Sequence, residues 1–216
     1  MRKYIAELLG TFMLVFLGTA TVVIAKGGVL AIGLAFGLAI TISAYAFGGI
    51  SGGHFNPAVT TGMLINKRIG VKDAFWYIIF QILGAIAASA FVSLFVRALG
   101  LKATALGQTD FPSISAGMAV LVEGLITFLF VLIILNVTSD DHGNSDFAGL
   151  VIGITLAFLI IVALNLTGGS LNPARSIGPA IFAGGSALNH LWVYVVAPEV
   201  GAVVAAFCSR ILNSEN

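Results

Sequence analysis

The sequence predicts an all-α membrane protein with six transmembrane helices, two half-membrane helices and an inverted internal repeat. Three observations predict this fold: the composition, the length of the apolar runs, and the recurrence of the same residues at one fixed offset. Of the 216 residues, 59% are hydrophobic and 9% are charged, whereas soluble domains carry about 25% charged residues. We therefore expect residues 1–216 to form a single domain surrounded by membrane lipid.

Six apolar runs follow one another along the chain. Each has about 20 residues, which is enough to cross about 30 Å of hydrocarbon at about 1.5 Å per residue. They cover residues 4–25, 29–47, 75–96, 114–137, 147–166 and 191–212. The first run is too long for a signal peptide and carries Glu7, so we interpret it as a retained helix.

Lysine and arginine residues in the short loops predict the orientation of the spans. A cytoplasmic N-terminus puts six of them on the cytoplasmic side and three on the other. The six are Arg2, Lys3, Lys67, Arg68, Lys72 and Arg210, and the three are Lys26, Arg97 and Lys102. We therefore expect a multi-pass protein of the cell membrane with both termini in the cytoplasm. The net charge of +1, without a basic tract, argues against nucleic acid as a partner.

One set of residues recurs along the chain at an offset of 116 positions. Glu7 in the first span and Glu123 in the fourth show this offset (123 − 7 = 116). Further pairs are Thr11/Thr127, Phe12/Phe128, Gly33/Gly149, Gly37/Gly153, Asn56/Asn172, Pro57/Pro173, Ala58/Ala174 and Trp76/Trp192. Each copy, over about residues 4–100 and 117–212, holds three spans, so the second copy must cross the membrane in the opposite sense. Such inverted repeats form their sites near the membrane midplane.

A shorter segment follows the second span of each copy and contains the sequence Asn-Pro-Ala. The two boxes are Asn56-Pro57-Ala58 and Asn172-Pro173-Ala174. Asparagine favours the N-cap of a helix and proline favours its first position. The apolar stretch after each box has about ten residues, which span about 15 Å, or half a bilayer. We expect two half-helices that enter from opposite faces and meet with their N-termini at the midplane.

The glycine-containing backbone before each box is expected to line a pore, because non-helical backbone at membrane depth must be buried in protein or face a watery cavity. The residues concerned are Gly52, Gly53, His54, Phe55, Gly168, Ser170 and Leu171. Each half-helix N-terminus carries about half a positive charge, and the asparagine amides should direct N–H donors into the pore. Both features disfavour cations and protons and favour neutral molecules.

The two boxes, the flanking Ser-Gly-Gly-His-Phe and Arg-Ser residues, and the paired glutamates resemble the aquaporin family over essentially the whole chain. This resemblance implies an hourglass fold and a homotetramer with one pore per subunit. It further implies a passive channel for water, with glycerol and dissolved gases as further candidate solutes, and no enzymatic activity, cofactor or metal.

By the same resemblance, an extracellular constriction is expected at Phe36, Ile160, Gly169 and Arg175. Water channels of the family usually have histidine where Ile160 stands. Glycerol facilitators typically have tryptophan at Phe36 and an aromatic residue at Gly169. The Phe36 and Ile160 combination is similar to the archaeal aquaporin M subgroup. The opening should therefore be somewhat wide and apolar, which leaves glycerol permeation open.

The glutamates inside the spans allow two interpretations. Glu7 and Glu123 could relay protons, or they could accept hydrogen bonds from the half-helix loops. Their symmetric placement favours the second interpretation. The main alternative class is a coupled secondary transporter, since inverted repeats with broken helices occur there as well. Glu199 in the last span has Leu83 as its repeat mate and receives no role from the sequence.

Overall fold

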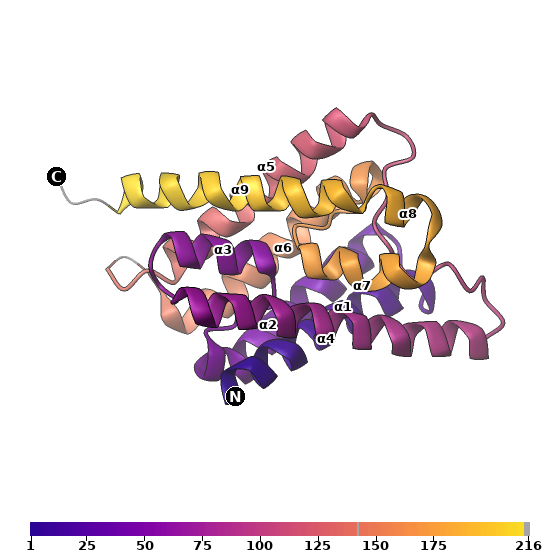
Figure 1. The fold of residues 1–216 in the computed structure, drawn as a ribbon, viewed down its shortest axis with the longest axis horizontal. Coiled ribbons are helices and arrows are strands. Elements are labelled where there is room, and N and C mark those ends of the chain that lie inside the picture. Colours follow the sequence, from indigo (N-terminus) through magenta and orange to yellow (C-terminus); the bar gives the residue numbers. More distant parts are fainter. Residues whose placement is uncertain (142, 214–216) are drawn as a thin grey trace.

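The computed structural model describes residues 1–141 and 143–213, and all regular secondary structure in these residues is helical (Figure 1). Six helices are long and apolar enough to cross a membrane. They are α1 (Arg2–Val23), α2 (Val29–Ser51), α4 (Val71–Ala98), α5 (Ala116–Val137), α6 (Ser145–Thr167) and α9 (Leu191–Leu212). The six predicted spans are confirmed. Helix α4 begins four residues before the apolar run because its first turn carries Asp73, which pairs with Lys3 of α1 (Nζ to Oδ2, 2.6 Å).

Three shorter helices complete the fold. Two of them, α3 (Pro57–Ile65) and α7 (Pro173–Ala183), begin directly after Asn56 and Asn172. The Asn56 side chain accepts a hydrogen bond from the Ala58 N–H (2.9 Å), and the Asn172 side chain accepts one from the Arg175 N–H (3.2 Å). These are the expected N-caps. The third, α8 (Gly185–Asn189), is one short turn that the sequence did not predict.

The two copies of the repeat pack against each other mainly through α2 and α6. At their crossing, a Cβ atom on Gly37 would lie 2.8 Å from the Cβ of Ala157, and one on Gly153 would lie 3.1 Å from the Cβ of Thr41. Because real Cβ atoms essentially never come closer than 3.0 Å, the backbones meet at a distance that only glycine allows at position 37. Small residues serve the same purpose in membrane helices generally.

The long helices surround the two half-helices, which Figure 1 shows roughly end to end in the middle of the bundle. Helix α1 begins and helix α9 ends toward the left of that view. Arg210 near the end of α9 donates from Nε to Asn66 Oδ1 at the end of α3 (3.1 Å). With six crossings, both termini therefore lie on the same side of the membrane-spanning bundle.

Candidate functional site

The backbone that precedes α3 is held by a buried glutamate of α1. Glu7 is fully buried. Its Oε1 accepts hydrogen bonds from Ser51 Oγ (2.6 Å) and from the His54 N–H (3.0 Å). Its Oε2 accepts from the Phe55 N–H (2.7 Å) and from Gln81 Nε2 (2.7 Å). One carboxylate thus provides partners for donors that no helix satisfies, and a buried donor without a partner costs about 1–3 kcal/mol.

Glu123 of α5 does the same for the backbone that precedes α7. It is fully buried, and its Oε1 accepts from Thr167 Oγ1 (2.6 Å) and the Ser170 N–H (3.0 Å). Its Oε2 accepts from the Leu171 N–H (3.0 Å). Leu171 and its counterpart Phe55 have φ angles of 55° and 51°, a left-handed conformation that costs a non-glycine residue about 1–2 kcal/mol. The two carboxylates stabilise the backbone in this unfavourable conformation.

The two asparagines bind across the repeat interface. Asn56 Nδ2 donates to the Leu171 carbonyl (2.8 Å), and Asn172 Nδ2 donates to the Phe55 carbonyl (2.9 Å). Each amide therefore stabilises the backbone that precedes the half-helix of the other copy. An amide group has two N–H donors, so each asparagine retains one for a molecule beside it.

A narrow cavity of about 10 Å³ connects the asparagines with the arginine of the second box. Its lining consists of Leu14, Phe36, Ile40, Asn56, Phe130, Leu156, Ile160, Ser170, Leu171, Asn172 and Arg175. The wall is mostly apolar, and its polar groups come from the two boxes and from Ser170. One water molecule needs about 10–15 Å³ of such space, so the cavity is narrow enough to admit no more than about one water molecule at a time.

Arg175 forms the polar wall at one end of this cavity. Its side chain is almost entirely buried. One terminal nitrogen donates to the Gly107 carbonyl (2.9 Å), and the guanidinium carbon lies 4.8 Å from the centre of the Phe36 ring. Its Nε has no hydrogen-bond partner among the described residues. Within the part of the chain that the structure describes, the guanidinium is thus buried with one donor unpaired.

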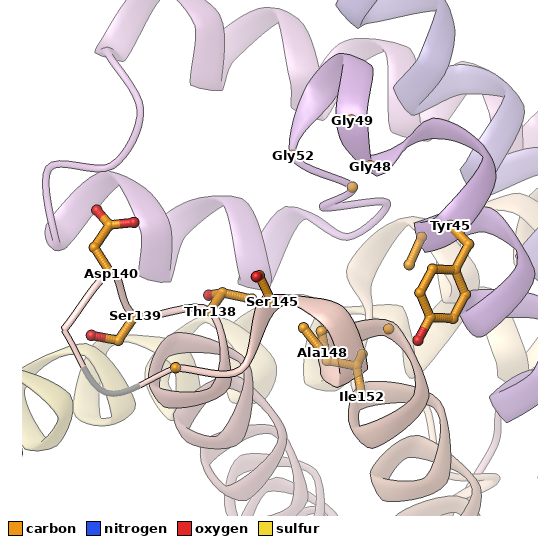
Figure 2. Close-up of a pocket in the computed structure, with 14 residues that line it drawn as sticks. Tyr45, Gly48, Gly49, Gly52, Thr138, Ser139, Asp140, Ser145, Ala148 and Ile152 are labelled. Atoms are coloured by element: carbon orange, nitrogen blue, oxygen red, sulfur yellow. The ribbon is translucent and has the colours of Figure 1, made fainter.

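The predicted glycines and His54 lie at different depths. Gly52 and Gly53 line a wide cavity of about 580 Å³, which Figure 2 shows between the end of α2 and residues that join α5 to α6. His54 lines a neighbouring cavity of about 440 Å³, and its Nδ1 lies 3.1 Å from Thr60 Oγ1. These cavities form a vestibule on the side of the termini.

Gly168 and Gly169 pack closely on residues of neighbouring segments. A Cβ atom on Gly168 would lie 3.2 Å from the Cα of Thr109, and one on Gly169 would lie 3.2 Å from the Cα of Ile160. Gly169 therefore packs on the backbone of Ile160, which itself lines the cavity. Neither glycine is among the residues that line the narrow cavity, and their place at the pore stays a prediction.

Two tyrosines that the sequence analysis did not single out complete the half-helix loops. The Tyr77 hydroxyl donates to the Ser51 carbonyl (2.7 Å), and the Tyr194 hydroxyl donates to the Thr167 carbonyl (2.7 Å). The acceptors are 116 residues apart (167 − 51), but the tyrosines are 117 residues apart (194 − 77). The two tyrosines thus depart by one residue from the offset of the repeat, and a search that allowed such a shift would have found them.

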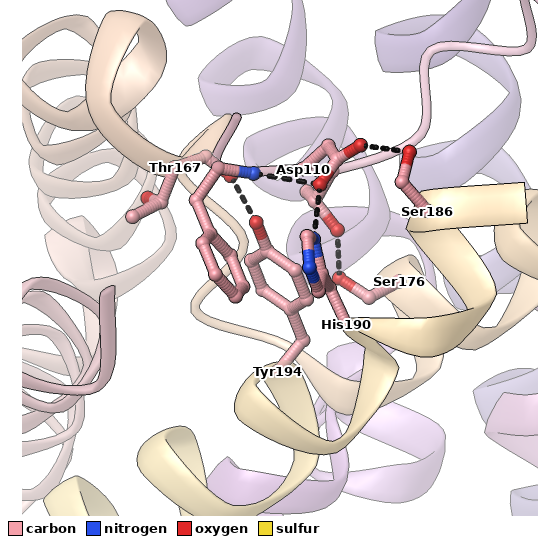
Figure 3. A network of polar contacts seen from close by, with 8 residues as sticks. Asp110, Thr167, Ser176, Ser186, His190 and Tyr194 are labelled. Carbon is pink, nitrogen blue, oxygen red and sulfur yellow. Dashed lines mark hydrogen bonds and ion pairs between the residues drawn. The ribbon is translucent and has the colours of Figure 1, made fainter. Parts of the chain in front are cut away.

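The segment between α4 and α5 also contributes to the site, although it carries no recognisable motif. Its Gly107 carbonyl binds Arg175, and its Thr109 hydroxyl lies 2.7 Å from the Ser176 hydroxyl. Figure 3 shows Ser186 and His190 converging on Asp110 of the same segment. The Asp110 carboxylate oxygens lie 2.6 Å from Ser186 Oγ and 2.6 Å from His190 Nδ1. These hydrogen bonds hold the segment beside the end of the cavity at which Arg175 lies.

Comparisons with known proteins agree with this geometry. The sequence model of the family described as major intrinsic protein matches residues 1–209. The chain belongs to the major intrinsic protein family. The predicted resemblance to aquaporins is thereby confirmed.

Relatives of this major intrinsic protein include bacterial and archaeal chains. Over its full length and that of the relative, it is 80% identical to the glycerol uptake facilitator protein-like 6 of Lactiplantibacillus plantarum. It is 41% identical to aquaporin AqpM of Methanothermobacter thermautotrophicus, with 99% of this chain and 98% of the relative covered. The aquaglyceroporin from Plasmodium falciparum has a similar structure, with a TM-score of 0.84, 28% identity, and coverage of 98% of this chain and 96% of that one.

Major intrinsic proteins are channels, so this chain is a membrane channel protein and not an enzyme. The expected fold of six spans and two half-helices is confirmed by the similarity to the aquaglyceroporin structure. Within residues 1–141 and 143–213, no group of three or more His, Cys, Asp and Glu side chains is arranged to hold a metal ion.

The carboxylate that fastens the segment between α4 and α5 gives a pH-dependent prediction. Burial alone would raise the pKa of Asp110, but hydrogen bonds from Ser186, His190 and the Phe111 N–H outweigh it and hold this pKa below the ordinary value of 3.8. A carboxyl with a depressed folded-state pKa stabilises the fold above its unfolded pKa and loses this effect as the pH falls through the folded one. Asp110 should therefore stabilise the channel at neutral pH and lose this effect progressively as the pH falls below about 4.

Melting of the detergent-solubilised channel between about pH 7 and pH 2 tests this prediction. The Asp110→Asn variant is expected to melt lower than the wild type at neutral pH, with the difference disappearing in acid. Asp141→Asn, a change at an exposed carboxylate, should follow the wild type throughout. A constant difference between Asp110→Asn and wild type over the whole range would contradict the prediction.

Proposed function

We propose that this major intrinsic protein is a passive channel that conducts water and small neutral solutes, including glycerol, and excludes protons and ions. The observation that carries the proposal is the narrow cavity in which Asn56, Asn172 and Arg175 belong to a mostly apolar wall. Passage requires a molecule that can accept hydrogen bonds from these donors and whose transfer out of water costs little free energy.

The charge distribution supports the exclusion of cations. The N-termini of α3 and α7 meet at the asparagines, and each contributes about half a positive charge. Arg175 adds a full positive charge at one end of the same cavity. A cation would meet three repulsive groups in a row, whereas a water molecule only needs to turn its oxygen toward them. At the asparagines this orientation interrupts the continuous hydrogen-bond chain that a proton would need.

Glycerol is proposed as a permeant for two reasons. The relative with 80% identity carries the name of a glycerol uptake facilitator-like protein. In addition, Ile160 lines the same narrow cavity as Arg175 and packs on Gly169, so the cavity offers an apolar surface as well as the arginine. A polyol can direct its hydroxyls to the arginine and its carbon chain to the isoleucine.

The remaining expectations form part of the same proposal. The channel is located in the cell membrane with both termini in the cytoplasm, which the distribution of Lys and Arg supports. The family resemblance supports a homotetramer. The same resemblance supports one pore in each subunit.

Stopped-flow light scattering of vesicles with the purified protein tests the function. We expect fast shrinkage in sucrose, shrinkage followed by re-swelling in glycerol, and no dissipation of a pH gradient. Ile160→Trp should block conduction because the indole fills the cavity, whereas Phe158→Trp, two positions away on α6 and 65% exposed, should conduct normally. Solute uptake that requires an ion or proton gradient would contradict a passive channel and favour a coupled transporter.

A further inference from the structure

The Phe36 ring lies against a glycine of α1 that does not line the pore. Gly18 is buried, and a Cβ atom placed on it would come closer than 3.0 Å to three carbons of the Phe36 ring. Atoms essentially never approach that closely. The absent side chain of Gly18 thus leaves a slot in α1 that the edge of the ring occupies.

The same ring also lines the narrow cavity. Phe36 belongs to the lining of this cavity, whose volume is about 10 Å³, and Arg175 lies 4.8 Å from the ring centre. Elsewhere the ring is embedded in the packed core that also contains Leu14, Ile32 and Ile40. A ring expelled from the slot therefore moves toward Arg175 and into the path of the permeant.

The following residue of α1 supports the arginine. A Cβ atom on Gly107 would lie 2.9 Å from the Cβ of Thr19, so the Gly107 backbone rests on α1. The Gly107 carbonyl accepts the hydrogen bond from Arg175. Gly18 thus packs against Phe36, and Thr19 packs against the segment that binds Arg175.

The inverted repeat indicates that the slot is not a requirement of the fold. The repeat mate of Gly18 is Ile134 (18 + 116), and the mate of Phe36 is Ile152 (36 + 116). The second copy thus packs the same pair of helices with isoleucine where the first copy has glycine. In the first copy, the glycine at this position leaves room for an aromatic ring that lines the pore.

We propose that Gly18 is a positioning residue that sets the width of the constriction by holding the Phe36 ring out of the pore. This inference rests on the proposed conduction through the cavity between Phe36 and Arg175. Adding one methyl group at position 18 narrows the channel, and it does so more for glycerol than for water because glycerol needs the larger opening.

The test compares Gly18→Ala, Phe36→Leu and the double variant in vesicles, with permeability normalised to the protein content. In Gly18→Ala we expect glycerol permeability to fall about tenfold, as an added barrier of about 1.4 kcal/mol would cause, and water permeability to fall less. In the Phe36→Leu background, Gly18→Ala should leave the ratio of glycerol to water permeability unchanged. Gly124→Ala, where the new Cβ meets no atom closer than 3.6 Å, serves as the matched glycine control.

The outcomes distinguish this inference from the proposed function. An unchanged permeability ratio in Gly18→Ala, or an equal change in the Phe36→Leu background, would overturn the role of Gly18. If Phe36→Leu itself left the ratio unchanged, the proposed constriction would be wrong. If Gly18→Ala failed to fold, a folded and conducting double variant would support the coupling of the two residues, and a misfolded double variant would overturn it.

Discussion

Glu123→Leu is expected to destabilise the channel by at least about 3 kcal/mol, because three buried donors lose their acceptor at about 1–3 kcal/mol each. These donors are the Thr167 hydroxyl and the N–H groups of Ser170 and Leu171. The left-handed backbone at Leu171 also loses its support. We expect the purified variant to aggregate or to elute at an altered size, with a melting temperature well below that of the wild type.

Glu123→Gln is the matched control for this prediction. Glutamine keeps the shape and one oxygen acceptor, so the loss of stability should be smaller. Because the carboxylate is expected to be structural, the folded Gln variant should conduct water at the wild-type rate without carrying protons. A Glu123→Leu protein as stable as the wild type would contradict the structural role. Proton flux in the wild type that disappears in Glu123→Gln would revive the proton-relay interpretation.

Arg175→Val is expected to have the largest effect on selectivity. Valine is the residue at the mate position, Val59, in the first copy, so the backbone of the half-helix accepts it. The change removes the positive charge from the cavity and the guanidinium that lies over Phe36. We expect glycerol permeability to rise about tenfold, which corresponds to a barrier lowered by about 1.4 kcal/mol, and a measurable leak of protons or cations to appear.

Two variants sharpen the test at Arg175. Arg175→Lys keeps the charge but lacks the planar guanidinium that binds the carbonyl and stacks on the ring, so it should still exclude cations while passing more glycerol. Arg97→Val, at an exposed position near the end of α4, should behave as the wild type. If Arg175→Val kept both the glycerol rate and the ion exclusion of the wild type, the arginine would not control selectivity.

The features that repeat at a fixed offset were the ones that the sequence could predict. The six spans, the two half-helices and the glutamate pair all follow from apolar length and the 116-residue offset. The hydrogen bonds of Tyr77 and Tyr194 were not predicted because these tyrosines lie 117 residues apart, one more than the offset of the repeat. Sequence periodicity locates helices well, but a shift of one residue hides contacts between them.

The features that depend on a single close approach could not be predicted. The carbonyl of Gly107 binds Arg175 from a segment without motif or periodicity, and nothing in its composition indicates the contact. The slot at Gly18 appears only when the Phe36 ring is seen beside it. Glu199, which had no role in the sequence analysis, is partly buried and contacts Thr61 of α3 rather than the narrow cavity.

The exchange of hydrogen bonds between the asparagines has a consequence for how the chain is made. Asn56 needs the Leu171 carbonyl, and Phe55 receives the amide of Asn172, so the first copy emerges from the ribosome more than a hundred residues before its partners exist. During that interval we expect the amide of Asn56 to lack this partner. We therefore expect the hydrogen bonds at the midplane to form in one late step, after the second half-helix has been made.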